Sequence, residues 1–456
     1  MTHVAIIGGG PGGYEAALIA RRLGAEVTIV DRDGLGGSTV LTDCVPSKTL
    51  IATSDLLTEV GSSAELGVEL PTSVSADLAA VNQRVLDLAA AQSSDIGERM
   101  AAAGVTVLSG TGKVVAANTV VATTATGDAT LVADGILIAT GAHPRVVDSA
   151  QPDGERILTW EQIYNLSELP THMIVVGSGV TGAEFASAYN GLGAKVTLVS
   201  SRSRVLPGED PDAANLIEDV FTRRGMTVMD NSRMESVVRD GDEVIVTLTD
   251  GRTVRGSHCL LALGSIPNTA GLGLADVGVG TDAGGFIEVD KVSRTAVPGI
   301  YAAGDCTGVF MLASVAAQQG RIAMAHLLGD AVHPLDLTKV SSNIFTSPEI
   351  ATVGVSQRQI DEQGLLVDTA MLPLATNPRA KMLGVHDGFV KLFSRQGVGT
   401  LIGGVVVGPK ASELIHTVAV AVSASLTADH VANAFTVYPS LSGSVGEVAR
   451  RLHRQL

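Results

Sequence analysis

Two short glycine-rich segments have the residue types and spacing of loops that bind dinucleotide phosphates. Gly8 to Gly13 and Gly177 to Gly182 each have the pattern Gly-x-Gly-x-x-Gly. In such a loop the first glycine allows a tight turn, the second lets the backbone approach a pyrophosphate, and the third permits a helix to pack closely on a strand. The helix that follows offers free N–H groups to the phosphates. One copy is a weak signal, but two copies predict two dinucleotide sites.

Each glycine segment is framed by the elements that such a site requires. In the first copy, apolar runs at 4–7 and 25–31 enclose an expected helix from Tyr14 to Leu23, and in the second, runs at 173–176 and 195–200 enclose a helix ending near Leu192. An apolar strand, a glycine turn, a helix and a second apolar strand make a βαβ unit. The chain is therefore expected to repeat this unit once.

The end of the second strand differs between the two copies. Asp31 and Ser200 each lie 23 residues after the first glycine of their loop, where an acid normally bonds a ribose hydroxyl. The second copy instead has Ser200 and Ser201, followed by Arg202 and Arg204. Neutral serines and two guanidinium groups would attract a 2′-phosphate. This predicts NADPH, beside NADH, at the second site; the alternative is that the arginines are solvated loop residues.

Composition excludes several classes of protein. The 456 residues carry 31 basic and 47 acidic side chains, a net charge of −16, which argues against a nucleic-acid partner. The three cysteines argue against a disulfide-stapled secreted scaffold. No apolar run approaches the roughly 18 residues of a membrane span, and a first strand expected at Val4 leaves no room for a leader. We expect a cytoplasmic protein without stable membrane insertion.

The chain is expected to be an α/β protein with two Rossmann-like domains and a C-terminal α+β domain suited to dimerisation. Residues 1–150 and 276–338 would form the first nucleotide domain, 151–275 the second, and 339–456 the C-terminal domain. A strand ending at Asp305 precedes an expected helix from Leu312 to Leu328, and an Ala/Val-rich helix is expected from Ser412 to Ser423.

Further segments match a known family in order along nearly the whole chain. They are the first loop with Asp31, Gly36–Lys48, Ala139–Gly141, the second loop with Glu184, Gly264–Asn268, Gly304–Asp305 and Phe345–Gly354. Through them the chain resembles flavoproteins of the pyridine nucleotide–disulfide oxidoreductase family, which includes dihydrolipoamide dehydrogenase and glutathione reductase. The resemblance implies FAD at the first site, NADPH or NADH at the second, and a homodimer, with higher assembly left open.

The resemblance also assigns roles to single residues. Lys48 would lie near flavin N5 and pair with Glu184, because a buried lysine needs a carboxylate and a cation there stabilises reduced flavin. The residues assigned to FAD are Gly8, Gly10, Pro11, Gly12, Gly13, Asp31, Arg32, Gly37, Ser38, Lys48, Gly112, Thr140, Gly141, Asp305, Leu312 and Ala313. Those assigned to the nicotinamide dinucleotide are Gly177, Gly179, Val180, Gly182, Glu184, Ser200, Ser201, Arg202, Arg204 and Gly264.

Departures from the family pattern bear on the chemistry. The redox disulfide needs Cys-x4-Cys, but Thr39 stands five residues before Cys44. The acid–base histidine and glutamate are replaced by Tyr438 and Gly443, and tyrosine is a poor base at neutral pH. Cys44 is either a sulfenic acid carrier or a relic packed beside the flavin, and Tyr438 either donates a hydrogen bond to an acceptor or fills the former histidine pocket.

The other cysteines and the histidines suggest no further chemistry. Cys259 and Cys306 are interpreted as small core residues. His326 and His333 lack metal-ligand clustering, so no metal site is predicted.

What remains intact is hydride transfer from nicotinamide to flavin, which needs only stacked rings and the charges of Lys48 and Glu184. These two residues, with Tyr438 and Cys44, are the candidate catalytic residues. Val180, at the position of the family's bulky gate, would leave the flavin face less obstructed. The acceptor must need neither thiols nor a strong protein base, which favours a quinone and predicts an FAD-dependent NAD(P)H:quinone oxidoreductase of ping-pong type. Soluble pyridine nucleotide transhydrogenase is the alternative enzyme, and a non-catalytic FAD/NAD(P)-binding subunit or redox sensor the alternative of another class.

Overall fold

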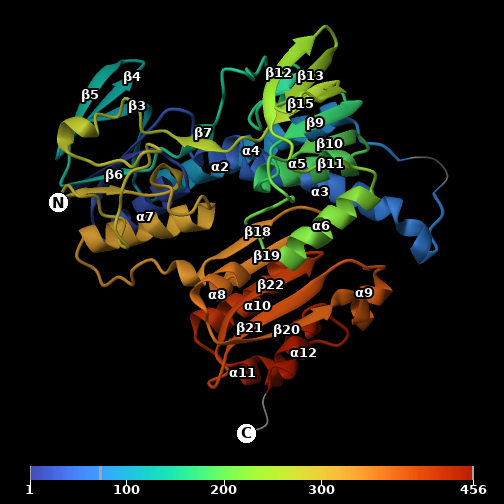
Figure 1. The fold of residues 1–456 in the computed structure, drawn as a ribbon. Helices are drawn as coiled ribbons and strands as arrows, with labels where there is room; N and C mark the ends of the chain where they lie inside the picture. The colour runs from blue at the N-terminus through green and yellow to red at the C-terminus, as the bar shows by residue number, and fades with distance from the viewer. Residues whose placement is uncertain (1, 71–73, 454–456) are drawn as a thin grey trace. The chain divides into compact units, whose positions relative to one another are not determined.

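The computed structural model describes residues 2–70 and 74–453, and it divides into two compact units (Figure 1). Unit 1 is built from the segment up to Thr49, from Asn82–Arg145 and from Gly264–Asp336. Unit 2 is built from Leu50–Val81, Val146–Leu263 and the chain from Leu337 onward. The helices α3 (Cys44–Gly61) and α4 (Leu78–Ala102) contribute residues to both units.

The central sheet of unit 1 contains the strand that leads into the first glycine loop. Its strand order is β17-β6-β1-β2-β3-β4-β5. The strands are β1 (His3–Ile7), β2 (Glu26–Asp31), β3 (Thr106–Ala116), β4 (Thr119–Thr124), β5 (Gly127–Val132), β6 (Gly135–Ile138) and β17 (Ile300–Ala302). The pairs from β17 to β3 are parallel and those of β3–β4–β5 antiparallel. Residues 300–302 therefore join the sheet of the first loop, although the second loop intervenes in sequence.

Two helices of unit 1 pack on this sheet and on each other. α1 (Pro11–Arg22) follows the first glycine loop, and α7 (Ala313–Leu327), orange in Figure 1, corresponds to the helix expected from Leu312 to Leu328. A Cβ at Gly320 would lie 2.1 Å from the carbonyl oxygen of Gly12, so only glycine lets the two helix backbones approach this closely. Their buried faces share one core with alternate residues of β1, including Val4 and Ile6.

The second glycine loop belongs to a parallel sheet in unit 2. The strand order is β11-β10-β9-β15-β8, with β8 (Ile157–Leu158), β9 (His172–Val176), β10 (Lys195–Val199), β11 (Thr227–Met229) and β15 (His258–Leu261). The helices of this part are α5 (Val180–Gly191) and α6 (Pro211–Arg223). β12 (Met234–Asp240), β13 (Glu243–Leu248) and β14 (Thr253–Gly256) form an antiparallel sheet beside it. Small strands β7 (Ala142–Pro144) and β16 (Ser265–Pro267) pair in unit 1.

The C-terminal part of unit 2 is an antiparallel sheet with helices. The order is β18-β19-β22-β21-β20, with β18 (Ser341–Ile344), β19 (Glu349–Gly354), β20 (Val367–Pro373), β21 (Phe389–Arg395) and β22 (Leu401–Gly408). The helices are α8 (Gln357–Gln363), α9 (Pro378–Met382), α10 (Ala411–Ser423), α11 (Ala428–Asn433) and α12 (Gly443–Arg451). α10 begins one residue before the helix expected from Ser412. Among the described residues, no helix is long and apolar enough to cross a membrane.

A buried lysine ties β21 to the start of α6. Lys391 Nζ lies 2.9 Å from a carboxylate oxygen of Asp210 and 2.9 Å from one of Asp212. Asp210 also caps α6, because its side chain accepts hydrogen bonds from the backbone N–H groups of Asp212 and Ala213. Burial alone would lower the pKa of Lys391, but the hydrogen bonds to Asp212 and Asp210 outweigh it and hold the pKa above its ordinary value.

Replacing Lys391 by methionine should destabilise unit 2. The change leaves the buried Asp210 carboxylate without its cation, whereas the half-exposed Asp212 can recover hydration, so we expect a loss of about 3 kcal/mol in the free energy of unfolding. Urea denaturation followed by circular dichroism measures it. Lys381→Met, at an exposed lysine of α9, is the matched control and should change stability by less than about 0.5 kcal/mol. Equal effects of the two variants would contradict the prediction.

Candidate active site

The first glycine loop is a turn that no other residue type could make. Gly8 has a φ of +104°, and a Cβ there would lie 2.2 Å from the carbonyl oxygen of Ala139. A Cβ at Gly13 would lie 1.9 Å from the carbonyl oxygen of Gly8. Gly10 differs, because its Cβ would meet nothing nearer than 4.0 Å. The open space at Gly10, together with an α1 N-terminus that no side chain caps, fits the approach of a pyrophosphate.

Asp31 stands at the end of β2 and holds the loop together. Its Oδ2 accepts a 2.6 Å hydrogen bond from the N–H of Gly9, and its Oδ1 accepts bonds from the N–H groups of Asp33 at 3.1 Å and Gly34 at 2.6 Å. An ionised carboxylate has about four acceptor positions, so Oδ2 keeps one for a ribose hydroxyl. The carboxylate therefore fits the role expected of it.

Asp305 follows β17 and has a carboxylate with unused acceptor capacity. Within the described chain no hydrogen bond to this carboxylate is formed, although the turn around it is fixed by Gln319, whose Oε1 accepts from the N–H of Gly304 at 2.8 Å. Burial and the nearby charge of Asp43 raise the pKa of Asp305 to about 6. A shielded carboxylate lacking a protein partner fits an acceptor for ligand hydroxyls, such as those of a ribityl chain.

A hydrogen-bonded clamp fixes the segment around Thr140. Thr140 Oγ1 donates to the carbonyl oxygen of Asn268 at 2.7 Å, and Asn268 Nδ2 donates to the carbonyl oxygen of Thr140 at 2.9 Å. The Asn268 amide also lies 2.6 Å from His143 Nδ1. The sequence alone assigned no role to Asn268 or Gln319. For Gln319, its polar side chain among the apolar, buried residues of α7 could have indicated a structural hydrogen bond.

Other residues assigned to the first site lie at several places in unit 1. Gly37 packs against the loop, since its Cβ would lie 2.9 Å from Gly10 Cα. Gly112 lies in β3, where a Cβ would meet the Ile7 side chain at 2.9 Å. Pro11 and Gly12 begin α1, Ser38 lies in α2 (Gly37–Leu41), and Lys48 is partly buried in α3. Arg32 is exposed and paired with Asp33, Gly141 has a positive φ, Leu312 precedes α7, and Ala313 begins it. Gly264, assigned to the second site, also lies in unit 1 and has a positive φ.

The second glycine loop repeats the geometry of the first. Gly177 has a φ of +113°, and its Cβ would lie 2.1 Å from the carbonyl oxygen of Ala262. A Cβ at Gly182 would lie 1.8 Å from the carbonyl oxygen of Gly177, whereas at Gly179 it would meet no atom within 4 Å. α5 begins at Val180 without a side-chain cap, so its N–H groups are free for phosphates. This loop, too, fits a dinucleotide.

The residues after β10 are arranged differently from Asp31. Ser200 is fully buried, and its Oγ lies 2.7 Å from Ser178 Oγ. Arg202 and Ser201 are exposed and Arg204 half-buried, and neither guanidinium group has an acidic partner in the described part of the chain. Two cations without an acidic partner among the described residues therefore follow the strand end at which the first copy has a carboxylate.

Glu184 lies on α5 and is buried in unit 2. Its Oε1 accepts a 2.8 Å hydrogen bond from the N–H of Phe345, just after β18. Ser187, one turn further along α5, accepts from the N–H of Ser347 at 3.1 Å. Lys48 belongs to unit 1 and Glu184 to unit 2, so their expected pairing stays a prediction.

The redox segment contains one thiol. Thr39 lies in α2 and Cys44 begins α3. Cys306 is buried, its Sγ donates to the carbonyl oxygen of Ala303 at 3.3 Å, and burial raises its pKa to about 11. Cys259 is equally buried in β15, and burial raises its pKa as well. Both are inert core thiols.

The positions that carry the family's acid–base pair lie near the start of α12. Tyr438 is 82% exposed, and Gly443 begins the helix.

Within the described residues no cluster of three His, Cys, Asp or Glu side chains could hold a metal ion.

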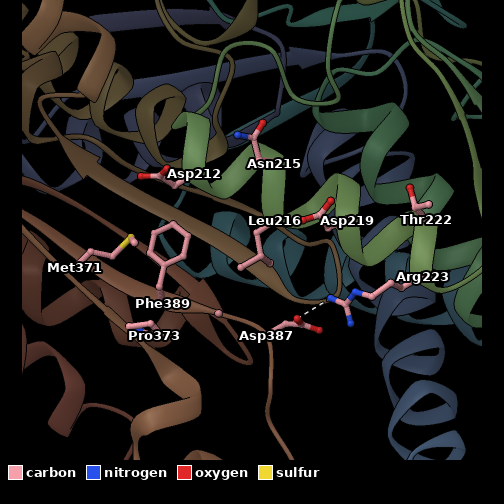
Figure 2. Close-up of a pocket in the computed structure, with 11 residues that line it drawn as sticks. Asp212, Asn215, Leu216, Asp219, Thr222, Arg223, Met371, Pro373, Asp387 and Phe389 are labelled. Carbon is pink, nitrogen blue, oxygen red and sulfur yellow. Dashed lines mark hydrogen bonds and ion pairs between the residues drawn. The ribbon is translucent and has the colours of Figure 1, made fainter.

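A separate cavity of about 600 Å³ lies between α6 and the β20–β21 region of unit 2 (Figure 2). Leu216, Met371 and Phe389 line it with apolar surface, and Asp387 forms a 2.6 Å ion pair with Arg223 at its side. It shares no lining residue with either glycine loop, so the candidate site is defined by the loops and not by this cavity.

The open space at Gly179 yields a test of the second loop. Gly179→Ala should fold and keep its flavin, because the added Cβ meets no protein atom within 4 Å. The methyl group would occupy the approach of the pyrophosphate, so KM for NADPH should rise by about tenfold or more. Steady-state kinetics and flavin absorbance measure the two effects. Gly208→Ala, where a Cβ is equally free, is the control; an unchanged KM for Gly179→Ala would contradict this role.

The raised pKa of Asp305 predicts pH-dependent flavin retention. Hydroxyl donors stabilise the ionised carboxylate, so FAD affinity should fall as the pH drops through about 6. Asp305→Asn should bind FAD about tenfold more weakly at pH 8 and lose that pH dependence. Fluorescence of released flavin measures both.

Asp43→Asn is the matched control for this prediction. Removing the neighbouring negative charge lowers the pKa of Asp305 and should move the fall in affinity to lower pH. The same pH dependence in wild type and Asp305→Asn would contradict the role of this carboxylate.

Comparisons with known proteins give the same picture over the whole chain. The family model described as pyridine nucleotide-disulphide oxidoreductase matches residues 2–320, and the dimerisation domain of that family matches residues 340–449. A protein of Mycobacterium tuberculosis named NAD(P)H dehydrogenase (quinone) is 53% identical over 99% of this chain and 94% of that protein. A dihydrolipoyl dehydrogenase of Chlorobaculum tepidum is 34% identical over 98% of this chain and 96% of that protein.

The crystal structure of LpdA from Mycobacterium tuberculosis agrees in fold as well as in sequence. It has a TM-score of 0.96 and 52% identity, and the match covers 100% of both chains. This confirms the expected α/β architecture with a C-terminal dimerisation domain, whereas the domain boundaries stay a prediction. The chain belongs to the pyridine nucleotide–disulphide oxidoreductase family, a family of enzymes that use FAD and NAD(P)H.

Proposed function

We propose that this protein is an FAD-dependent NAD(P)H:quinone oxidoreductase and not a disulfide reductase. The observation that carries the proposal is the redox segment, in which threonine, Thr39, stands where Cys44 would need its partner thiol. Cys259 and Cys306 are buried core residues with raised pKa values, so neither supplies the missing thiolate. The relative from Mycobacterium tuberculosis, 53% identical, is named for quinone reduction and supports this acceptor.

The residues present suit hydride transfer without thiol exchange. FAD, when bound, accepts a hydride from NAD(P)H and delivers two electrons to the acceptor. Lys48 would place a cation beside the flavin, and Glu184, which Phe345 already orients through a backbone hydrogen bond, would compensate that charge. Val180 is 45% exposed at the start of α5 and leaves room for a nicotinamide ring.

The proton balance also favours a quinone. A dithiol reaction needs a protein base, but Tyr438 stands at the histidine position and Gly443 at that of its glutamate. A quinone that takes two electrons and two protons becomes a hydroquinone, and water can supply the protons. The acceptor therefore demands no acid–base pair from this chain.

The protein is proposed to act as a homodimer. Residues 340–449 match the family's dimerisation domain. In the same part of the chain, Phe435 is fully exposed, and Val437 and Tyr438 are 78% and 82% exposed. Large apolar side chains left open in one segment are typical of surfaces that a partner covers.

An acceptor screen tests the proposal. The purified protein should be yellow, NADPH should bleach it without air, and menadione should then restore the colour. Menadione reduction should exceed reduction of a thio-NAD analogue by NADPH, lipoamide should not be reduced, and double-reciprocal plots should be parallel. Faster thio-NAD reduction would identify a transhydrogenase, and a colourless protein would identify a binding subunit.

A further inference from the structure

The two glycine loops hold the following strand end by different means. In the first loop the N–H of Gly9 donates to the Asp31 carboxylate at 2.6 Å. At the same place in the second loop a side chain takes over, because Ser178 Oγ lies 2.7 Å from Ser200 Oγ. The hydroxyl pair thus occupies the position of the hydrogen bond to the carboxylate.

The hydroxyl group of Ser200 is fully buried among hydrogen-bonding groups of the protein. It accepts a hydrogen bond from the N–H of Arg202 at 3.1 Å, and the carbonyl oxygens of Arg202 at 3.1 Å and Arg204 at 3.5 Å are acceptors for its proton. The hydroxyls of Ser200 and Ser178 share a further hydrogen bond at 2.7 Å, which either hydroxyl can donate. Because Ser200 is fully buried, its hydroxyl is closed to a ribose, whereas the partly exposed Asp31 carboxylate is not.

Further hydrogen bonds fix the loop that carries Arg202 and Arg204. The N–H of Leu206 donates to the carbonyl oxygen of Ser178 at 2.8 Å, and the N–H of Val205 donates to a carboxylate oxygen of Glu218 at 3.0 Å. The carbonyl oxygen of Arg202 accepts from the N–H of Asn231 at 2.8 Å. Ser178 therefore holds this loop at both ends, through its hydroxyl at Ser200 and its carbonyl at Leu206.

We propose that Ser178 is a positioning residue that makes the second site select a 2′-phosphate over a 2′-hydroxyl. Its hydroxyl removes Ser200 as a ribose acceptor and fixes the loop whose two guanidinium groups have no acidic partner in the described chain. A dianionic phosphate would neutralise these cations, whereas a free hydroxyl would find a buried serine, Ser200, at the position of the Asp31 carboxylate. The inference rests on the proposed use of NAD(P)H and adds which residue governs the choice between NADPH and NADH.

Binding of the adenosine half alone tests this selection in the flavin-loaded protein. Wild type should bind adenosine 2′,5′-bisphosphate more tightly than adenosine 5′-monophosphate in calorimetric titrations. Ser178→Ala should weaken binding of the bisphosphate about fivefold, the effect of one lost hydrogen bond, and leave the monophosphate within about twofold. Ser178→Gly should behave in the same way. Because the first loop has a glycine, Gly9, at this position, this second variant controls for a folding defect of Ser178→Ala.

Two further variants separate positioning from a general effect on the loop. Ser203→Ala removes an exposed hydroxyl of the same loop and should change neither affinity. In a Ser200→Ala background, Ser178→Ala should add little, because the bond between the two hydroxyls is already lost. In steady-state assays of the single variant Ser178→Ala, KM for NADPH should rise. Its kcat with either nucleotide and its KM for NADH should stay unchanged.

Three results would overturn the inference. Ser178→Ala could weaken the binding of both nucleotides equally, or leave the ratio of the bisphosphate affinity to the monophosphate affinity unchanged. The third is a wild-type protein that binds both nucleotides with equal affinity. Because the titrations use no quinone, a failure of quinone reduction would refute the proposed function and leave this inference standing. Conversely, quinone reduction with an unchanged affinity ratio would refute only the role of Ser178.

Discussion

In each nucleotide unit, the close packing of the helix start against the glycine turn before it is the constraint on which the rest of the site depends. A Cβ at Gly13 would lie 1.9 Å from the carbonyl oxygen of Gly8, and one at Gly182 would lie 1.8 Å from that of Gly177. Only glycine allows the helix to start this close to the preceding strand. This closeness directs the uncapped helix N-terminus into the loop, and the same geometry therefore fits the phosphates of two different dinucleotides.

The loop after the second strand of each unit is free of that constraint, and there the two copies diverge. Asp31 gathers three backbone N–H groups around one carboxylate. Ser200 holds the corresponding loop with one hydroxyl, which is also hydrogen-bonded to the Ser178 side chain. The Asp31 carboxylate retains an acceptor position for a ribose, whereas the Ser200 hydroxyl is buried within the protein. In the proposed scheme, nucleotide selectivity is a consequence of how each loop satisfies its own hydrogen bonds.

Local features could be predicted from the sequence, and long-range pairings could not. The glycine loops, α1, α5, α7 and α10 follow from spacing and apolar periodicity, which act within a few residues. The bond between Thr140 and Asn268 joins residues 128 positions apart, and that between Lys391 and Asp210 joins residues 181 apart. These depend on the register in which distant segments meet. Ser178 was missed for another reason, since the motif accepts any residue type at its position.

The departures from the family pattern are changes of chemistry and not of fold. At Gly443 a Cβ would meet nothing nearer than Ser440 Oγ at 3.5 Å, so packing does not exclude a larger side chain at the position of the family's glutamate. Thr39 lies in an ordinary helix, α2, and Cys44 begins the next one.

The framework around these positions is retained. Glu184 is still oriented by the N–H of Phe345, and both phosphate loops keep their glycines. A chain that keeps the elements for hydride transfer and lacks those for thiol exchange must pass its electrons to an acceptor that needs neither a thiol nor a protein base. Quinones have that property, because electron uptake and protonation by water complete their reduction.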